Sequence, residues 1–287
     1  MLEFPTGKAH VSYSEVKAWS ECSYRHKLMY VDKIQTYEDN PYADFGTVVH
    51  NEIENFLNGQ QISVKNVQMQ LDQIWEEKKY DSAEYIEKIR TARAEIGSRY
   101  VHENLDTWKT SAENILHDLP TFLDEQFPGW EPFRAEQELY EEIGISDLKF
   151  KGFIDCIIKV PSPRSKSKKN YWLLDWKTTG KGGWYFTKRK EFISLAQVGL
   201  YKKYWSENAT IPLKDIRTGY VFLKRGAKKG KTCELFKVST GPKFIEKADK
   251  LVSNMIRNVE KRFTLKNYNN CKFCPFKGTE HCDGKGW

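Results

Sequence analysis

Large apolar residues recur near helical spacing in the first part of the chain. Over residues 12–34 they predict a long helix, and Ser12 followed by Glu15 fits a capping box at its start. Residues 43–58 predict a second helix, which the turn-forming pair Asn58-Gly59 would end.

From residue 64 to 126 the pattern stays helical, with breaks expected near Tyr80-Asp81 and Thr110, and Pro128-Gly129 closes this region. Beyond it, apolar and β-branched residues follow one another at strand spacing. The predicted strands are 133–143, 148–160, 171–179, 219–225 and 232–238, and helices are predicted over 191–206 and 242–263. This order predicts an α/β core with a helical insertion at 60–130.

The composition narrows the class of protein. A chain of 287 residues forms one large domain or two small ones, and a net charge of +7 fits either a nucleic-acid partner or a merely soluble surface. Neither a signal peptide nor an apolar run of transmembrane length occurs, so we expect an intracellular (cytoplasmic) protein without a membrane partner. Its six cysteines are then expected to be thiols or metal ligands rather than disulfides.

Two aspartates and a lysine lie on the predicted strands in a pattern that suggests chemistry. If 148–160 and 171–179 pair as an antiparallel hairpin, Asp155 and Asp175 lie near one sheet edge, where a divalent cation would relieve their repulsion. Lys177 is two residues from Asp175 and therefore projects from the same face. An ordinary salt bridge between these two residues is the alternative interpretation.

The stretches GFID (152–155) and DWKT (175–178) resemble the core motif of the PD-(D/E)XK nuclease superfamily, in particular its RecB-like branch. FGTVVHNEIENFL (45–57) and AQVGLYKKYW (196–205) resemble two further motifs of that branch, in the same order along the chain. The resemblance implies a restriction-endonuclease-like core, which is a central mixed sheet flanked by helices, in a single nuclease domain that spans 1–287.

The resemblance also implies roles for particular residues. His50, Asp155 and Asp175, with the main-chain carbonyl of Trp176, would hold Mg²⁺ or Mn²⁺, while Lys177 would help to activate water. Gln197 and Tyr201, one helical turn apart, would line the site and contact DNA or the lysine. His50 could instead be an ordinary helix-face histidine, and the last two could be polar positions of an amphipathic helix. Glu136 or Glu138 could support the metal; the sequence leaves open which.

The cysteines predict a metal centre near the C-terminus. Cys271 and Cys274 form a CxxC pair that can grip one metal ion, and Cys282 follows. The opening segment 10–34 resembles that of iron–sulfur nucleases of the AddB and CRISPR-adaptation types, which implies that Cys22 is the fourth ligand of a [4Fe–4S] cluster and that the 268–287 tail packs against the 12–34 helix. Zn²⁺, with Cys22 or His281 as the fourth ligand, is the rival.

Two basic turns, 159–170 and 224–231, could contact DNA phosphates if they flank the active site, or could simply be solvated. Four aromatic residues also allow two interpretations. They could stack on the bases of single-stranded DNA, or they could belong to the core: Trp176, Trp184, Tyr185 and Phe186.

We therefore expect a metal-dependent DNA nuclease, most simply an exonuclease acting on single-stranded or frayed ends in recombination, repair or replication, including phage replication. A DNA-binding or assembly module without turnover is the main alternative, and a redox-sensing metal-cluster protein is a weaker one. The chain has no G-x-x-x-x-G-K-[ST] phosphate loop, so any unwinding would need a helicase or recombination partner.

Overall fold

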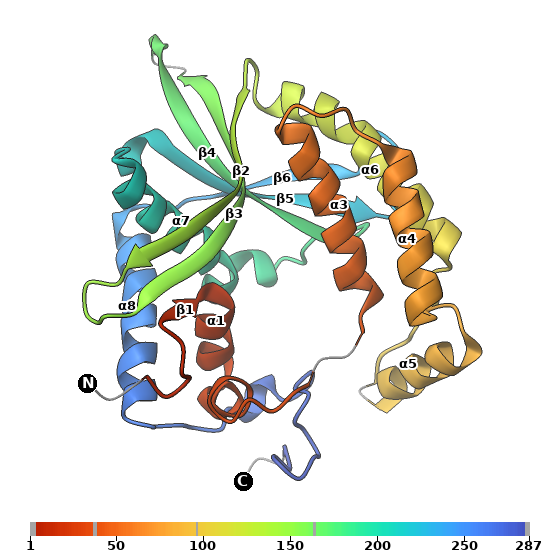
Figure 1. The fold of residues 1–287 in the computed structure, drawn as a ribbon, viewed down its shortest axis with the longest axis vertical. Helices are drawn as coiled ribbons and strands as arrows, with labels where there is room; N and C mark the ends of the chain where they lie inside the picture. The colour runs from red at the N-terminus through yellow and green to blue at the C-terminus, as the bar shows by residue number, and fades with distance from the viewer. Residues whose placement is uncertain (1–3, 37–38, 96, 163–164, 285–287) are drawn as a thin grey trace.

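A computed structural model describes residues 4–36, 39–95, 97–162 and 165–284 (Figure 1). Its centre is a six-stranded mixed sheet in the order β1-β3-β4-β5-β6, with β2 paired to β3 as well. β1 and β3 are parallel, as are β4 and β5, and the other pairs are antiparallel. The strands are β1 (His10–Ser12), β2 (Glu131–Glu142), β3 (Lys149–Ser162), β4 (Ser165–Gly180), β5 (Ile216–Arg225) and β6 (Cys233–Val238).

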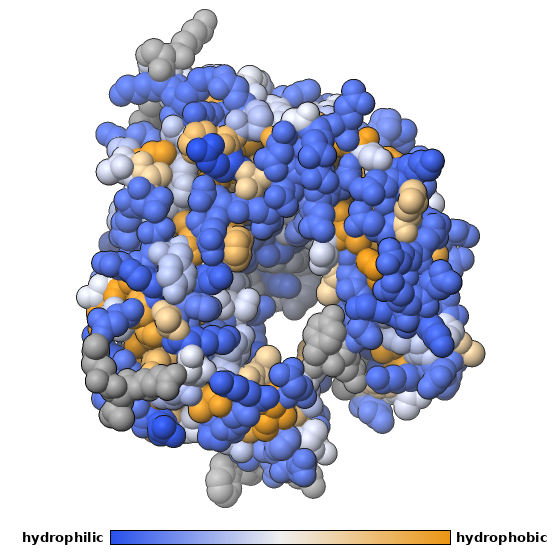
Figure 2. Space-filling model, in the orientation of Figure 1, coloured by the Kyte–Doolittle hydropathy of each residue, from blue (hydrophilic) through white to orange (hydrophobic). Residues whose placement is uncertain are grey.

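Helices cover both faces of this sheet. They are α1 (Tyr13–Glu21), α2 (Ser23–His26), α3 (Pro41–Leu57), α4 (Val64–Lys78), α5 (Ala83–Glu95), α6 (Leu105–Gln126), α7 (Phe192–Ala209) and α8 (Pro242–Glu260). Helices α3, α4 and α6 lie over one face, and α1, α7 and α8 lie over the other (Figure 1). The surface is largely hydrophilic on the face shown in Figure 2 and is hollowed between α1 and α3. The predicted α/β class, a mixed sheet flanked by helices, is confirmed.

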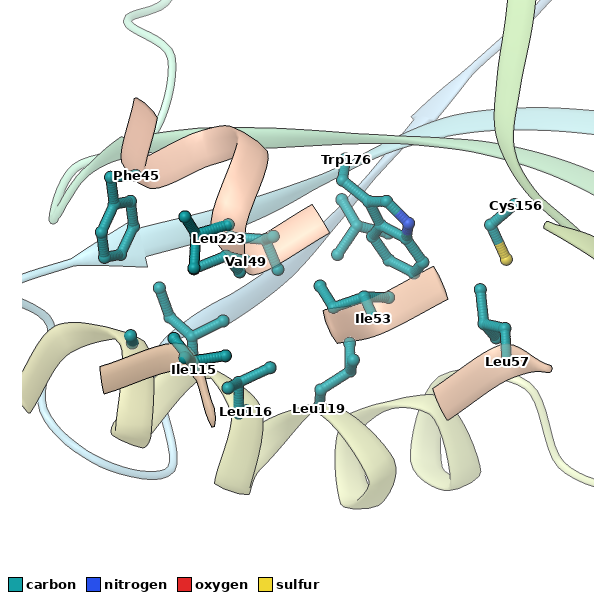
Figure 3. Close-up of a cluster of buried hydrophobic side chains, with 14 of the residues drawn as sticks. Phe45, Val49, Ile53, Leu57, Ile115, Leu116, Leu119, Cys156, Trp176 and Leu223 are labelled. Atoms are coloured by element: carbon teal, nitrogen blue, oxygen red, sulfur yellow. The ribbon is translucent and has the colours of Figure 1, made fainter. Parts of the chain in front are cut away.

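The alternation of side chains along the strands builds one core on each face. Cys156 and Ile158 of β3 point into the core under α3 and α6, whereas Ile157 between them points into the core under α7 and α8. Figure 3 shows the first core, where Trp176 of β4 packs among Ile53 and other side chains of α3 and α6.

The segment predicted as a helical insertion forms α4, α5 and α6. Val67 and Leu71 of α4 are fully buried in the first core, as are Ile115 and Leu119 of α6, so α4 and α6 complete that core. The expected break near Tyr80-Asp81 is present, but the one at Thr110 is wrong, since this residue lies inside α6. The chain turns earlier, and the Asn104 side chain caps α6 by accepting a hydrogen bond from Thr107 N.

The long helix predicted over 12–34 is broken at Cys22, which is extended (φ −164°, ψ 108°). The Cys22 sulfur caps the next helix by accepting a hydrogen bond from Arg25 N. Ser12 caps α1 as predicted, by accepting from Glu15 N, but the Glu15 carboxylate does not return to Ser12. It pairs with the buried His26 Nε2 at 3.0 Å, so the capping-box prediction is only half right.

Strand β1 was not predicted, because three residues give no readable period. The hairpin of β3 and β4 is confirmed and extends further into the 161–170 turn than predicted, to Ser162 and from Ser165. None of the helices in the described part of the chain is long and apolar enough to cross a membrane.

Candidate active site

The two aspartates meet where β3 and β4 separate. The ladder between these strands ends at the pair Cys156 and Leu174, and beyond it β4 continues beside β5 alone. Asp155 lies in the resulting gap, and its Oδ2 accepts a hydrogen bond of 2.7 Å from Trp176 N. The Asp155 carboxylate thus takes the place of a strand partner for the Trp176 amide. This hydrogen bond also holds it beside Asp175.

Asp175 and Lys177 project from the same face of β4, as predicted. Lys177 Nζ lies 2.5 Å from Asp175 Oδ2, with the lysine side chain 31% exposed and the aspartate 1% exposed. Burial raises the pKa of Asp175, and burial together with the Asp175 charge raises that of Asp155. Burial alone would lower the pKa of Lys177, but the two aspartates outweigh it and hold the pKa above its usual value. The site therefore attracts cations.

Helix α3 brings His50 to the same place. Gly46, one turn before it, lets the helix approach β4 closely: a Cβ there would lie 3.1 Å from Thr178 Oγ1. Burial, followed by the positive charge of Lys177, lowers the pKa of His50 to about 4. Its imidazole is therefore neutral near pH 7 and able to bind a metal ion.

Helix α7 supplies the other two predicted residues. Gln197 Nε2 donates a hydrogen bond of 3.1 Å to the Tyr201 hydroxyl, which confirms that they share one helix face. Burial and the Asp175 charge raise the pKa of Tyr201, so its hydroxyl stays protonated. The Tyr201 ring lies against Gly152, where a Cβ would be 2.8 Å from Tyr201 Cε1. The glycine of GFID is thus explained by the approach of this ring.

Replacing Gly152 by alanine is expected to destabilise the protein by about 1–3 kcal/mol, because the added methyl group overlaps the Tyr201 ring and forces it or β3 to shift. Urea denaturation measures this cost. Gly144→Ala is the matched control, since a Cβ there meets nothing within 4 Å. Equal stability of both variants would contradict the close approach.

The structure separates Glu136 from Glu138. Glu138 pairs with Lys151 at 3.5 Å, away from the aspartates. Glu136 has a positive φ of 45° and its pKa is raised by burial, then by Glu54 and Asp175, which places its carboxylate near the site. Glu54 was missed from the sequence, although its position four residues after His50 puts it on the same face of α3.

Several buried polar atoms around Lys177 lack hydrogen-bond partners. Among the described residues, His50 Nε2 and both carboxylate oxygens of Asp175 have none, and Asp175 Oδ2 has only its 2.5 Å ion pair with Lys177. Such orphaned atoms are costly and call for a further partner. Nitrogen and carboxylate oxygen are donors that Mg²⁺ and Mn²⁺ accept. In the described ranges, however, no three His, Cys, Asp or Glu side chains already form a complete metal-binding group.

A cleft of about 640 Å³ opens beside these residues. Lys177 and Gln197 line one part of it, and residues of α1, α2, the segment directly after α2 and the turn after β4 line most of the rest. Its further cations and aromatic groups were not assigned to the active site from the sequence. The 10–34 segment was linked only to the cysteine centre, and Trp184 was considered only for base stacking or core. These residues are Tyr13, Lys17, Arg25, Tyr30, Trp184 and Lys188. The cleft reaches Pro275 in the cysteine-rich tail.

The four cysteines predicted as metal ligands lie around one pocket, although no three of them in the described ranges already form a metal-binding group. Cys22, Cys271, Cys274 and Cys282 line one small pocket of about 20 Å³ between α2 and the tail. Burial and the other three thiols raise the pKa of Cys271. The Cys22 sulfur accepts a hydrogen bond of 3.4 Å from Asn267 N, which ties the break between α1 and α2 to the tail.

The His281 imidazole lies 3.5 Å from the Glu280 carboxylate, while its carbonyl accepts a hydrogen bond from Tyr24. It is not among the side chains that line the cysteine pocket. The contacts of the tail with α1 and α2 also include the amides of Asn267 and Asn270, which both donate to Glu21 O.

The basic turns do not line this cleft in the part of the chain that the structure describes. In the second turn, Arg225 pairs with Glu103 and Lys224 with Glu234, so these cations are largely neutralised. In the first, Lys169 pairs with Glu131, and Arg164 lies outside the described residues.

The aromatic set divides into two kinds. Trp176 and Trp184 are core residues, with 1% and 9% exposure. Tyr185 and Phe186 are each 70% exposed.

Comparison with known proteins identifies the family of the chain. No curated protein sequence matches the chain. Among solved structures, the chain is similar to a "Putative exonuclease" from Eubacterium rectale, with 12% identity, a TM-score of 0.47, and coverage of 88% of this chain and 82% of the other. The model of the PD-(D/E)XK nuclease superfamily matches residues 10–279, a range that contains His50, Asp155, Asp175 and Lys177 but ends before Cys282. The chain belongs to the PD-(D/E)XK nuclease superfamily.

Proposed function

We propose that this nuclease is a metal-dependent deoxyribonuclease that degrades DNA from single-stranded or frayed ends. The observation that carries the proposal is a pair of buried atoms without partners, His50 Nε2 and Asp175 Oδ1, next to the Asp175–Lys177 ion pair at the end of a cationic cleft. A buried polar atom without a partner weakens a fold unless it binds something.

In this proposal His50, Asp155 and Asp175, with the Trp176 carbonyl, hold Mg²⁺ or Mn²⁺, and Glu136 supports them. The bound ion would lower the pKa of water and polarise the phosphodiester. Hydrolysis joins a water oxygen to phosphorus and breaks one ester P–O bond, so negative charge moves across the phosphoryl group. The Lys177 ammonium, exposed to the cleft, stabilises that charge and orients the water.

Tyr201 and Gln197 act as positioning residues in this proposal. The Tyr201 hydroxyl accepts the Gln197 hydrogen bond and can donate its own proton to a substrate oxygen, because its pKa is raised and it stays protonated. Their shared helix face borders the two aspartates, so they hold a phosphate next to Lys177.

We also propose that the four cysteines bind a metal centre, a [4Fe–4S] cluster in preference to Zn²⁺. Four sulfur donors that line one pocket fit either centre. Protein purified without oxygen is expected to contain about four iron atoms per chain and to show the broad visible absorbance of a cluster.

Cys274→Ser is expected to lose this metal. Cys233→Ala is the control, because Cys233 packs against the core under α3 and keeps the centre intact. If the wild type contains zinc and no iron, the cysteines bind Zn²⁺ rather than a cluster. If it contains neither metal, the proposal of a metal centre is contradicted.

The substrate preference is tested with three end-labelled or circular DNAs in Mn²⁺: a linear single strand, a circular single strand and a blunt duplex. The proposal predicts that the linear single strand is degraded fastest, that the circle survives and that the duplex is degraded more slowly. Cleavage of the circle would reject an exonuclease, and faster degradation of the duplex would reject the single-strand preference.

A further inference from the structure

The turn between β4 and α7 presents two adjacent aromatic side chains to solvent. Tyr185 and Phe186 are each 70% exposed, and together they follow the catalytic strand by only a few residues. Exposed aromatic residues that occur singly need no explanation, but a pair beside a functional cleft does.

This turn is firmly held in place. Trp184 packs against Tyr220 and Phe222, with ring centroids 4.8 and 5.2 Å away. Arg189 Nε donates to Trp184 O at 2.7 Å, and Arg189 N donates to Tyr185 O at 3.2 Å. These contacts fix the conformation of the turn, and the exposure of Tyr185 and Phe186 follows from that conformation.

Gly183 makes the turn possible. Its φ is +65°, a value that favours glycine, and a Cβ there would lie 3.2 Å from both Arg189 Nη2 and Phe222 Cδ2. The same close packing that buries Trp184 thus turns the next two rings outward.

Cations surround the pair and join it to the cleft. Trp184 and Lys188, on either side of the pair in sequence, both line the cleft that contains Lys177. Lys190 Nζ lies 3.9 Å from the centre of the Phe186 ring. Burial and then the charge of Lys17 lower the pKa of Lys188. Lys177 adds to this effect and Glu191 and Glu21 oppose it, so Lys188 is repelled by two other lysines of the cleft. An anion would relieve that repulsion.

We propose that Tyr185 and Phe186 form a stacking platform for unpaired bases, and that Lys17 and Lys188 bind the phosphate next to the one cleaved at Lys177. This inference rests on the proposed function and names the residues that give the preference for unpaired DNA. The faces of bases inside a duplex are covered by their neighbours, whereas an unpaired base can place its face on an aromatic ring. The lysines give affinity, and the rings distinguish single strands from duplex.

Binding measured in EDTA separates recognition from cleavage. Fluorescence anisotropy compares a short single strand with a blunt duplex, on the wild type and on the double variant Tyr185→Ala/Phe186→Ala. We expect the variant to bind the single strand about ten- to a hundredfold more weakly, and the duplex as the wild type does. Tyr140→Ala is the matched control, because this tyrosine of β2 is 46% exposed. It should change neither the affinity for the single strand nor the affinity for the duplex.

An oligonucleotide with abasic sites tests stacking itself. Removing the bases should weaken binding to the wild type and have little effect on the double variant, since the variant has already lost the platform. For the lysines, Lys188→Gln should reduce the salt dependence of binding to both DNAs.

Wild-type single-strand affinity in the double variant would overturn the inference, and would favour a protein partner as the occupant of the pair. An equal loss for single strand and duplex would overturn it too. Both results leave the proposed function intact if the wild type still cleaves DNA. A wild type that neither binds nor cleaves DNA would instead reject the proposed function, and the inference with it.

Discussion

Replacing Lys177 by methionine is expected to lower single-turnover DNA cleavage by about 10²–10³-fold, which is the usual effect of losing one preorganised charge at a reacting group. Methionine keeps much of the aliphatic stem but removes the ammonium that lies 2.5 Å from Asp175 Oδ2. The loss should appear in the rate at saturating DNA, because the ammonium acts on charge that develops during the reaction.

Lys190→Met is the matched control for this change. Lys190 is an exposed lysine outside the group around Asp175, and its ammonium lies over the Phe186 ring. It should affect DNA affinity at most, with the saturating rate unchanged. Cleavage by Lys177→Met at the wild-type rate, or equal losses in both variants, would contradict the role given to Lys177.

Replacing Asp175 by asparagine is expected to stabilise the metal-free protein by roughly 1–3 kcal/mol and to abolish its response to divalent cations. The Asp175 carboxylate is 1% exposed, its oxygens have no partner but Lys177 among the described residues, and it repels Asp155. The neutral amide removes the cost of burying this charge and its repulsion of Asp155. Lys177, which loses its ion-pair partner, can still reach solvent. Mn²⁺ should raise the melting temperature of the wild type and leave that of the variant unchanged.

The same change should alter the pH dependence of stability. Because the pKa of Asp175 is raised on folding, the folded protein binds more protons than the unfolded chain above the ordinary carboxyl value of about 4. Wild-type stability should therefore fall as the pH rises from that value through the raised pKa, and Asp175→Asn should lose part of this decline. Urea denaturation across this range in EDTA measures both slopes. A variant less stable than the wild type throughout would contradict the account.

The local pattern of the sequence was sufficient for the strands and for the side of β4 that carries Asp175 and Lys177. A period of two residues fixes which side chains share a face, whatever the neighbouring strands do. The position of Asp155 depends on where the ladder between β3 and β4 ends, and no local pattern encodes that point. The position of Asp155 beside Asp175 was predicted because the GFID and DWKT stretches resemble the motifs of a known family.

The break at Cys22 could not be predicted for a similar reason. The apolar period continues through residues 12–34, so the pattern favours one helix. At this break Ser23 accepts a hydrogen bond from Leu265 N and Cys22 accepts one from Asn267 N, both from residues more than two hundred positions away. The cleft also escaped prediction, since it is assembled from α1, α2 and the turn after β4. Lys17, Arg25 and Lys188 form one site only because the fold brings them together.

The most direct test of the central claim is the cleavage of an end-labelled linear single strand by the wild type, in Mn²⁺ and in EDTA, beside Asp155→Ala. The account predicts a ladder of shortened products in Mn²⁺ only, with none from the variant in either condition. Equal cleavage in EDTA, or by Asp155→Ala, would contradict a metal-dependent reaction at this site. Tight binding without cleavage in any metal would show that the chain is a DNA-binding module on a nuclease fold.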